Sequence, residues 1–302
     1  MPVSARFAAV AMVQLLIKVT LFALMFALGL GLQSTALQQW RQRPALLVRV
    51  LVGSCLLVPL GALLLIKLSL VLPVAPPVRY AIALMALSPS APLTLHKAGR
   101  KGGDREMAAL LQVLAAIAAI VTIPLMADLF RQVFSVSGWD LAHADVALQV
   151  LVAQVLPLLL GLGLRRWLPA LAARLVGPLE KLANGLLLLL VLVILGLTLP
   201  ALGSFLAGNL IALPLMAVMA ALCLAIGWLL AGPDPAESTT TALVTSMRNP
   251  GLALLFASSH APGIPAVKLA ILSYVLVTVI ISIPFLMAQQ RRQHSDRHGA
   301  AS

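Results

Sequence analysis

Apolar runs long enough to cross a lipid bilayer recur along the whole chain, separated by short loops. Hydrophobic residues fill 61% of the 302 positions and charged residues only 10%, whereas soluble domains average about 45–50% and about 25%. In lipid, backbone groups must be satisfied inside a helix or a closed barrel. Continuous apolar runs favour helices over the short alternating segments of a barrel. The sequence therefore predicts an all-α polytopic membrane protein.

The apolar runs predict about nine transmembrane helices, with ends placed to within about 2–4 residues. They cover residues 10–32, 47–71, 78–101, 104–129, 144–167, 181–203, 208–231, 236–259 and 264–288. We expect residues 1–290 to form a single membrane domain and the polar residues 291–302 to form a disordered tail. The first run is too long for a signal peptide and lacks a clear cleavage site, which favours a membrane span.

The basic residues gather in alternate loops. The chain has a formal net charge of +12, but its cations lie in short loops and form no aromatic-studded basic surface, which excludes a nucleic-acid partner. One set of loops carries Arg6, Arg79 and Arg131. The other carries Arg41, Arg43, Arg49, Lys97, Arg100, Lys101, Arg105, Arg165, Arg166, Arg174, Lys181, Arg291, Arg292 and Arg297. The positive-inside rule then predicts a plasma-membrane protein with the N-terminus outside and the C-terminus in the cytoplasm.

The eighth predicted span, 236–259, is interrupted at its centre by residues 247–251, with the sequence MRNPG. An arginine at a helix centre in the membrane costs about 2.5–3.5 kcal/mol on insertion scales. Asn249 is a suitable N-cap, and Pro250 suits the first position of a helix because its missing N–H would be unpaired there anyway. We therefore expect two half-helices that meet near the middle of the membrane.

The third predicted span, 78–101, is also interrupted, by residues 88–92 with the sequence SPSAP. Two prolines three residues apart break the hydrogen-bond ladder of a helix. Each broken span lies between two intact spans, and the two sets run through the membrane in opposite directions. This pattern predicts an inverted-topology repeat with two discontinuous crossing helices, which in secondary transporters form the binding site.

Arg248 is the most unusual candidate site residue. It could stand in for a coupling cation or clamp an anionic substrate together with the half-helix ends. It could equally be structural and satisfy carbonyl groups freed at the break. The other candidates for binding an ion or substrate are Ser88, Ser90, Thr94, Gln112, Thr245, Ser246 and Asn249. Such side chains also satisfy backbone groups or join helices, so both interpretations stay open.

Motifs for catalysis or metal binding are absent from the sequence, which has no Ser/His/Asp set, no HExxH and no phosphate loop. Cys55 and Cys223 lie within apolar runs and are expected to be reduced thiols. We therefore expect neither an enzyme nor a cofactor or metal site. An ion channel or membrane sensor on the same scaffold remains the alternative to a transporter.

Three segments resemble the bile acid:sodium symporter family in its nine-span form: 87–94 (LSPSAPLT), 245–253 (TSMRNPGLA) and 155–163 (VLPLLLGLG). The resemblance implies a core (47–129 and 208–288) and a panel (10–32 and 144–203). It also implies a small organic anion as the substrate, bound between core and panel and transported by alternating access.

The sodium ligands of that family are replaced here. A family acid aligns with Val244 and a family glutamine with Arg248. Sodium is a hard cation that requires several oxygen ligands, and arginine stays charged at every relevant pH. These departures from the family pattern argue against strict sodium coupling, and leave coupling to Na⁺, to H⁺, or no coupling open. The sequence does not determine the substrate, the direction of transport or the oligomeric state.

Overall fold

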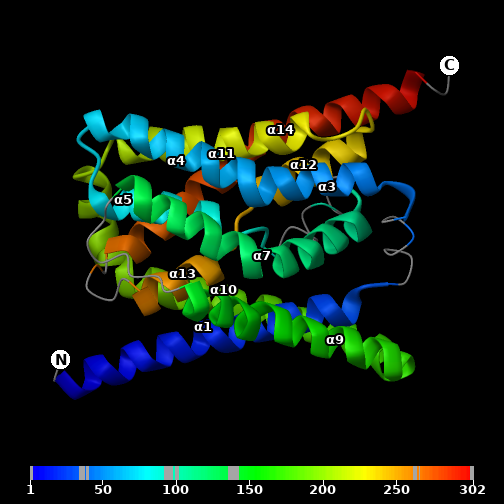
Figure 1. The fold of residues 1–302 in the computed structure, drawn as a ribbon, viewed down its shortest axis with the longest axis horizontal. Helices are drawn as coiled ribbons and strands as arrows, with labels where there is room; N and C mark the ends of the chain where they lie inside the picture. The colour runs from blue at the N-terminus through cyan, green and yellow to red at the C-terminus, as the bar shows by residue number, and fades with distance from the viewer. Residues whose placement is uncertain are drawn as a thin grey trace.

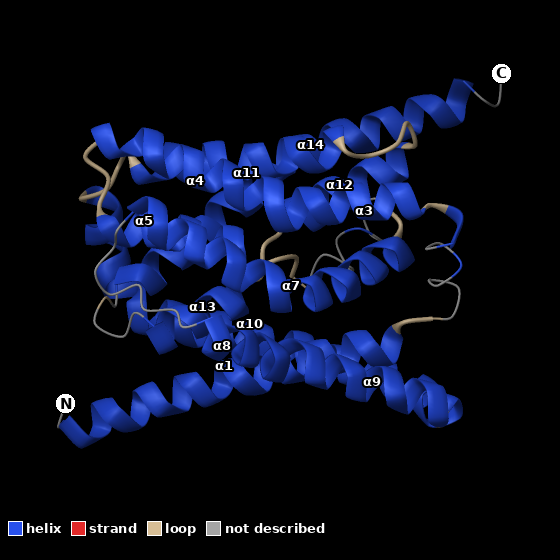
Figure 2. Ribbon diagram, in the orientation of Figure 1, coloured by secondary structure: helices blue, strands red, loops and turns tan. Residues whose placement is uncertain are grey.

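The computed structural model describes residues 3–33, 38, 41–91, 98, 102–134, 143–260, 264 and 266–299. Within these ranges the regular elements are helices (Figure 2), with one isolated β-bridge. The first half contains α1 (Val3–Gly31), α3 (Pro44–Val52), η1 (Gly53–Leu57), α4 (Val58–Leu68), η2 (Ser69–Val71), α5 (Pro76–Leu87) and α7 (Arg105–Phe134). The second half contains α8 (His143–Val150), η3 (Leu151–Val155), α9 (Leu156–Trp167), α10 (Pro169–Ala207), α11 (Ala212–Leu229), α12 (Pro235–Ser246), α13 (Pro250–His260) and α14 (Ala266–Gly299). The all-α prediction is confirmed.

Among the described residues, seven helical segments are long and apolar enough to cross a membrane. They cover 11–31, 44–71, 105–134, 144–167, 169–197, 212–229 and 266–292, and each overlaps one of the predicted intact spans. The two segments predicted to be broken do not appear among them. In their places lie the short apolar helix α5 and the pair α12 and α13.

Two of the long helices contain a single wide turn directly before a proline. The π-helical turn η1 lies before Pro59 and η3 lies before Pro157. A proline inside a helix lacks an N–H and clashes with the carbonyl four residues earlier. That residue is Cys55 in one case and Ala153 in the other, and each lies inside its π turn. The wider turn lets both helices continue through a proline.

The helices form two layers (Figure 1). One layer, the α1 layer, consists of α1, α8, η3, α9 and α10; α1 packs closely against α9 and α10. The other layer contains α3 to α7 and α11 to α14, with α11 packed against α12 and α14. We call the interface between the two layers the seam. The described chain begins at one end of the molecule, with α1, and finishes at the opposite end, with α14 (Figure 1).

Glycines allow the closest approach inside the α1 layer. A Cβ atom on Gly161 would collide with the backbone carbonyl of Phe26, and one on Gly29 with that of Leu158. Small residues at such positions let helix backbones pack in contact, which is a principal source of helix association in membranes. The α1–α9 pair is therefore held by backbone contact that no larger residue can preserve.

Two predicted boundaries differ from the structure. Helix α10 begins at Pro169, whereas the span was expected from 181, because residues 169–180 are rich in good helix formers and begin with a proline at N1. Helix α14 continues to Gly299, whereas a disordered tail was expected from 291. The residues after 288 include Gln289, Gln290, Arg291 and Arg292, which all favour helix, and the next helix breaker is Gly299.

The short helices are the most enclosed elements of the fold. In α5 every residue from 80 to 87 is buried, in α12 every residue from 237 to 246, and in α13 every residue from 251 to 258. A helix that is buried on all sides contacts other protein rather than lipid. The C-terminal ends of α5 and α12 and the N-terminal end of α13, with the backbone groups that their helices leave unpaired, therefore lie inside the protein.

Candidate functional site at the paired helix breaks

The break in the eighth predicted span has the expected form. Helix α12 ends at Ser246 and α13 begins at Pro250. The Asn249 side-chain Oδ1 accepts a hydrogen bond from the backbone N–H of Leu252 at 3.2 Å, which is the contact of an N-cap. The prediction of an interruption here, with Asn249 as cap and Pro250 as first helical residue, is confirmed.

This break pairs with the one that follows α5. The backbone N–H of Ala91 donates to the carbonyl of Met247 at 2.8 Å, and the N–H of Asn249 donates to the carbonyl of Ser88 at 3.3 Å. Together they form an isolated antiparallel bridge between Ser90 and Arg248. Backbone groups that leave their helices at the two breaks therefore satisfy one another away from water, as buried peptide groups must. The segment after Ala91, including Thr94, lies outside the described residues.

Arg248 is only 3% exposed, and its guanidinium holds the end of α5. Its Nε donates to the carbonyl of Met85 at 3.1 Å and its Nη2 donates to that of Ala86. These carbonyls belong to the last turn of α5, where they carry the negative end of the helix dipole; the Met85 carbonyl also accepts from the N–H of the C-cap residue Ser88 at 3.2 Å. A permanently charged side chain at this helix end is stabilised by the helix dipole.

The same guanidinium also reaches the wide turn η1. Its Nη1 donates to Ser54 Oγ at 2.8 Å and, within its own helix end, to the carbonyl of Thr245 at 3.4 Å. Four of the five guanidinium N–H groups are thus directed at neutral oxygens. Among the described residues no carboxylate forms an ion pair with Arg248. The arginine is surrounded by oxygens as a bound metal cation would be.

Three other candidate residues make hydrogen bonds that stabilise the fold: two at helix ends and one between helices. The Ser88 hydroxyl donates to the carbonyl of Leu84 at 2.7 Å, and that of Ser246 to the carbonyl of Leu243 at 3.4 Å, so both satisfy their own helix ends. Gln112 on α7 donates through Nε2 to the carbonyl of Ala91 and to Ser90 Oγ at 3.4 Å, which joins a third helix to the bridge.

Three polar atoms of the candidate residues are buried without a hydrogen-bond partner among the described residues. They are Gln112 Oε1, Thr245 Oγ1 and Asn249 Nδ2. Such atoms are rare in folded proteins, because each costs about 1–3 kcal/mol. Thr245 and Asn249 flank the break between α12 and α13, and Gln112 reaches the bridge from α7, so the three atoms are available to bind a water, ion or ligand there.

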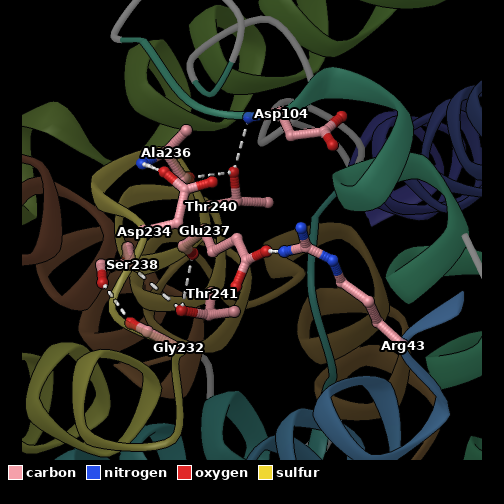
Figure 3. A network of polar contacts seen from close by, with 9 residues as sticks. All are labelled: Arg43, Asp104, Gly232, Asp234, Ala236, Glu237, Ser238, Thr240 and Thr241. Atoms are coloured by element: carbon pink, nitrogen blue, oxygen red, sulfur yellow. Dashed lines mark hydrogen bonds and ion pairs between the residues drawn. The ribbon is translucent and has the colours of Figure 1, made fainter.

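At the other end of α12, a separate polar network ties several elements together (Figure 3). Asp234 caps the helix, accepting from the N–H of Ala236 at 2.9 Å, and Glu237 pairs with Arg43. The N–H of Asp104 donates to Thr240 Oγ1 at 2.7 Å, so the residue before α7 is bound to α12. The hydroxyls of Thr239, Thr240 and Thr241 donate to carbonyls four residues earlier. This threonine run is used by the helix itself.

The seam has a hollow at each end. One, of about 500 Å³, lies between α1, α8 and α13 and is lined by Lys18, Phe22, Asp145, Gln149, Leu255 and His260, among others. The other, of about 410 Å³, lies between α1, α7, α9 and α10 and is lined by Gln33, Arg105, Glu106, Arg165 and Glu180, among others. Hollows of this size accommodate small organic molecules.

Sequence reasoning did not identify Ser54 as a partner of Arg248. Ser54 lies in an apolar run beside Gly53, and only Pro59, five residues later, gave any sign of an irregular turn. It also did not identify the hollows, because their residues come from helices far apart in the chain.

Comparison with known proteins supplies the class. The profile of the sodium bile acid symporter family matches residues 18–205, which is more than half of the chain and ends before Arg248. A search among curated proteins found no match. The matched region contains α5, its break, Gln112 and most of the α1 layer. The chain is therefore a membrane transporter that belongs to the sodium bile acid symporter family.

Proposed function

We propose that this protein is a secondary active transporter that moves a small organic anion by alternating access. The observation that carries the proposal is the pair of helix breaks joined inside the protein, with a buried arginine between them. In secondary transporters, substrate and ion sites form where discontinuous helices leave backbone groups inside the membrane.

In this proposal the second layer is the core and the α1 layer is the panel. The core keeps the predicted crossing of two discontinuous helices and their inverted repeat. The panel moves against it along the seam. The hollows at the two ends of the seam support this view, because each is a place where solute could enter from one side. The hollow with Arg105 and Arg165 lies at the end that we propose is cytoplasmic, following the distribution of basic loops.

Arg248 takes the role of the coupling cation in this mechanism. Four of its donors are used by Met85, Ala86, Ser54 and Thr245, and it is almost fully buried, so direct contact with a substrate is less well supported. A fixed guanidinium gives the permanent charge that a sodium ion would otherwise bring. Transport is then expected to proceed without sodium.

The test uses purified protein with the double substitution Val244→Glu and Arg248→Gln. It removes the fixed cation and adds a buried carboxyl group, which is tolerated there only when it is protonated or paired with a cation from solution. The melting temperature of the double variant is expected to be higher in NaCl than in KCl at equal ionic strength, since a bound ion stabilises the folded state. The wild type is expected to melt at the same temperature in both salts. A sodium-specific increase in the wild type would contradict the role given to Arg248.

Uptake tests the transport proposal itself. Organic anions that raise the melting temperature of the wild type are then added to proteoliposomes that contain the protein, and their uptake is measured. We expect the wild type to take up the anion in a saturable manner that does not require sodium. We expect the Arg248→Ala variant to fold but to show no uptake. Unsaturable flux, or single-channel conductance, would instead favour a channel on this scaffold. Unchanged uptake and affinity in a folded Arg248→Ala protein would contradict the site assignment.

A further inference from the structure

Among the residues that the structure describes, one ion pair crosses the seam. Arg105 Nη2 donates to both carboxylate oxygens of Glu180, at 2.8 and 2.9 Å. Arg105 is the first residue of α7, in the second layer, and Glu180 lies on α10, in the α1 layer. The contact therefore joins the two bodies that must separate in the transport cycle.

The other two ion pairs among the described residues do not cross the seam. Arg131 pairs with Asp128 three residues earlier on the same helix, α7. Arg43 pairs with Glu237 of α12, within the second layer. Only the Arg105–Glu180 pair, of these three, is broken by a movement of one layer against the other.

The surroundings of this pair indicate that the contact is specific. A cation in the first turn of a helix opposes the helix dipole, and at the start of α7 the capping Asp104 and the neighbouring Glu106 offset it. Glu180 adds a further acid, from the other layer, that contacts the Arg105 guanidinium directly. Its Oε1 lies 3.4 Å from the Cβ position of Gly31 on α1, so the carboxylate rests against a glycine that leaves it room. Both residues line the hollow of about 410 Å³.

The opposite end of the seam is bridged differently. Gln149 on α8 donates through Nε2 to Ser259 Oγ at 2.9 Å, and its Oε1 lies 3.1 Å from His260 Nε2; both partners belong to α13. These contacts form between a side-chain amide, a hydroxyl and an imidazole. The polar contacts at the two ends of the seam therefore differ in kind: an ion pair between charged side chains at one end and contacts of an amide with a hydroxyl and an imidazole at the other.

We propose that the Arg105–Glu180 pair is a latch that keeps the proposed cytoplasmic end of the seam closed. Release of the pair frees α7 from α10 and opens the hollow that also contains Arg165. The latch sets the fraction of molecules open to the cytoplasm, and with it the rate of the reorientation step. This inference rests on the proposed function, because it requires the two layers to move.

The experiment measures opening directly and needs no substrate. Ala109 lies one turn after Arg105, is 7% exposed and lines the same hollow. Ala109→Cys is introduced, and the rate of reaction with a bulky maleimide is measured in detergent, with the labelled position identified by mass spectrometry. Arg105→Glu is expected to raise the rate at position 109 by about threefold to fivefold, the upper part of the range that loss of a partly exposed ion pair predicts. Glu180→Gln is expected to raise it to a similar extent.

The charge swap separates a latch from a general loss of stability. The double variant Arg105→Glu with Glu180→Arg is expected to return the labelling rate to within about twofold of the parent. Arg131→Ala serves as the matched control, since its pair on α7 has nearly the same exposure but does not cross the seam. Labelling of the buried native Cys223 reports global unfolding and is expected to stay unchanged.

Equal labelling in the parent and in both single variants would overturn the latch, and so would a rise at position 109 accompanied by an equal rise at Cys223. The proposed function is tested by a different experiment, and the absence of saturable uptake in proteoliposomes would contradict it. If the protein transports but the labelling rate at position 109 is the same in the parent and the variants, only the latch proposal is contradicted.

Discussion

At the scale of single residues, Arg248 is bound mainly by backbone carbonyls. Arg248→Met would remove the guanidinium donors from the buried carbonyls of Ala86 and Met85, of which Met85 keeps its bond from the Ser88 N–H. A buried carbonyl left without a donor costs about 1–3 kcal/mol. Arg248→Lys keeps the charge, but the three N–H donors of lysine sit on one nitrogen atom. That ammonium group cannot reach η1 and α5 at the same time, as the planar guanidinium does. We expect thermal stability in the order wild type, then lysine, then methionine. Arg49→Met, at an exposed arginine of α3, is the control and should change stability by less than about 0.5 kcal/mol.

Asn249 allows a second residue-scale test. Asn249→Ala removes the cap of α13 and is expected to destabilise the protein by about 1 kcal/mol, whereas Asn249→Ser keeps an acceptor and should cost less. Both variants leave the backbone bond from residue 249 to Ser88 in place. Thermal unfolding in detergent compares them. Equal melting temperatures for alanine and serine would mean that the cap contributes nothing.

At the scale of helices, the α1–α9 contact depends on glycine. Gly161→Ala places a methyl group against the carbonyl of Phe26 and is expected to lower the melting temperature and the yield of folded protein. Gly196 on α10 has no atom within 4 Å of its Cβ position. Gly196→Ala is therefore the matched control. It should be neutral or stabilising, because alanine favours a helix over glycine by roughly 0.5–1 kcal/mol.

Local chemistry explains which features of the fold the sequence could predict. The cap and the proline at 249–250 specify a helix start whatever surrounds them, so the break between α12 and α13 was predictable. The seven long helices follow from apolar length alone. By contrast, two of the carbonyls that bind Arg248, those of Met85 and Ala86, come from residues more than 160 positions earlier, and backbone groups are alike in every sequence. Only the three-dimensional arrangement brings them to the guanidinium.

At the scale of the whole molecule, the proposed orientation is open to a direct test. A green fluorescent protein joined to the C-terminus of the full chain should fluoresce in cells, since it folds in the cytoplasm but not after export in an unfolded state. An epitope at the N-terminus should be reached by antibody on intact spheroplasts. The physical reason is the excess of basic residues in one set of loops. Fluorescence lost at the C-terminus, with an inaccessible N-terminal epitope, would reverse the assignment.

The bridge between Ser90 and Arg248 also has a consequence for biosynthesis. Residues 88–91 leave the ribosome more than 150 positions before residues 247–249, which supply their backbone partners. Throughout that interval the nascent chain holds exposed peptide groups in the bilayer, a costly state that attracts water or an insertase. A chain terminated at residue 246 would keep this defect, and quality-control proteases should degrade it even though its first seven predicted spans were complete.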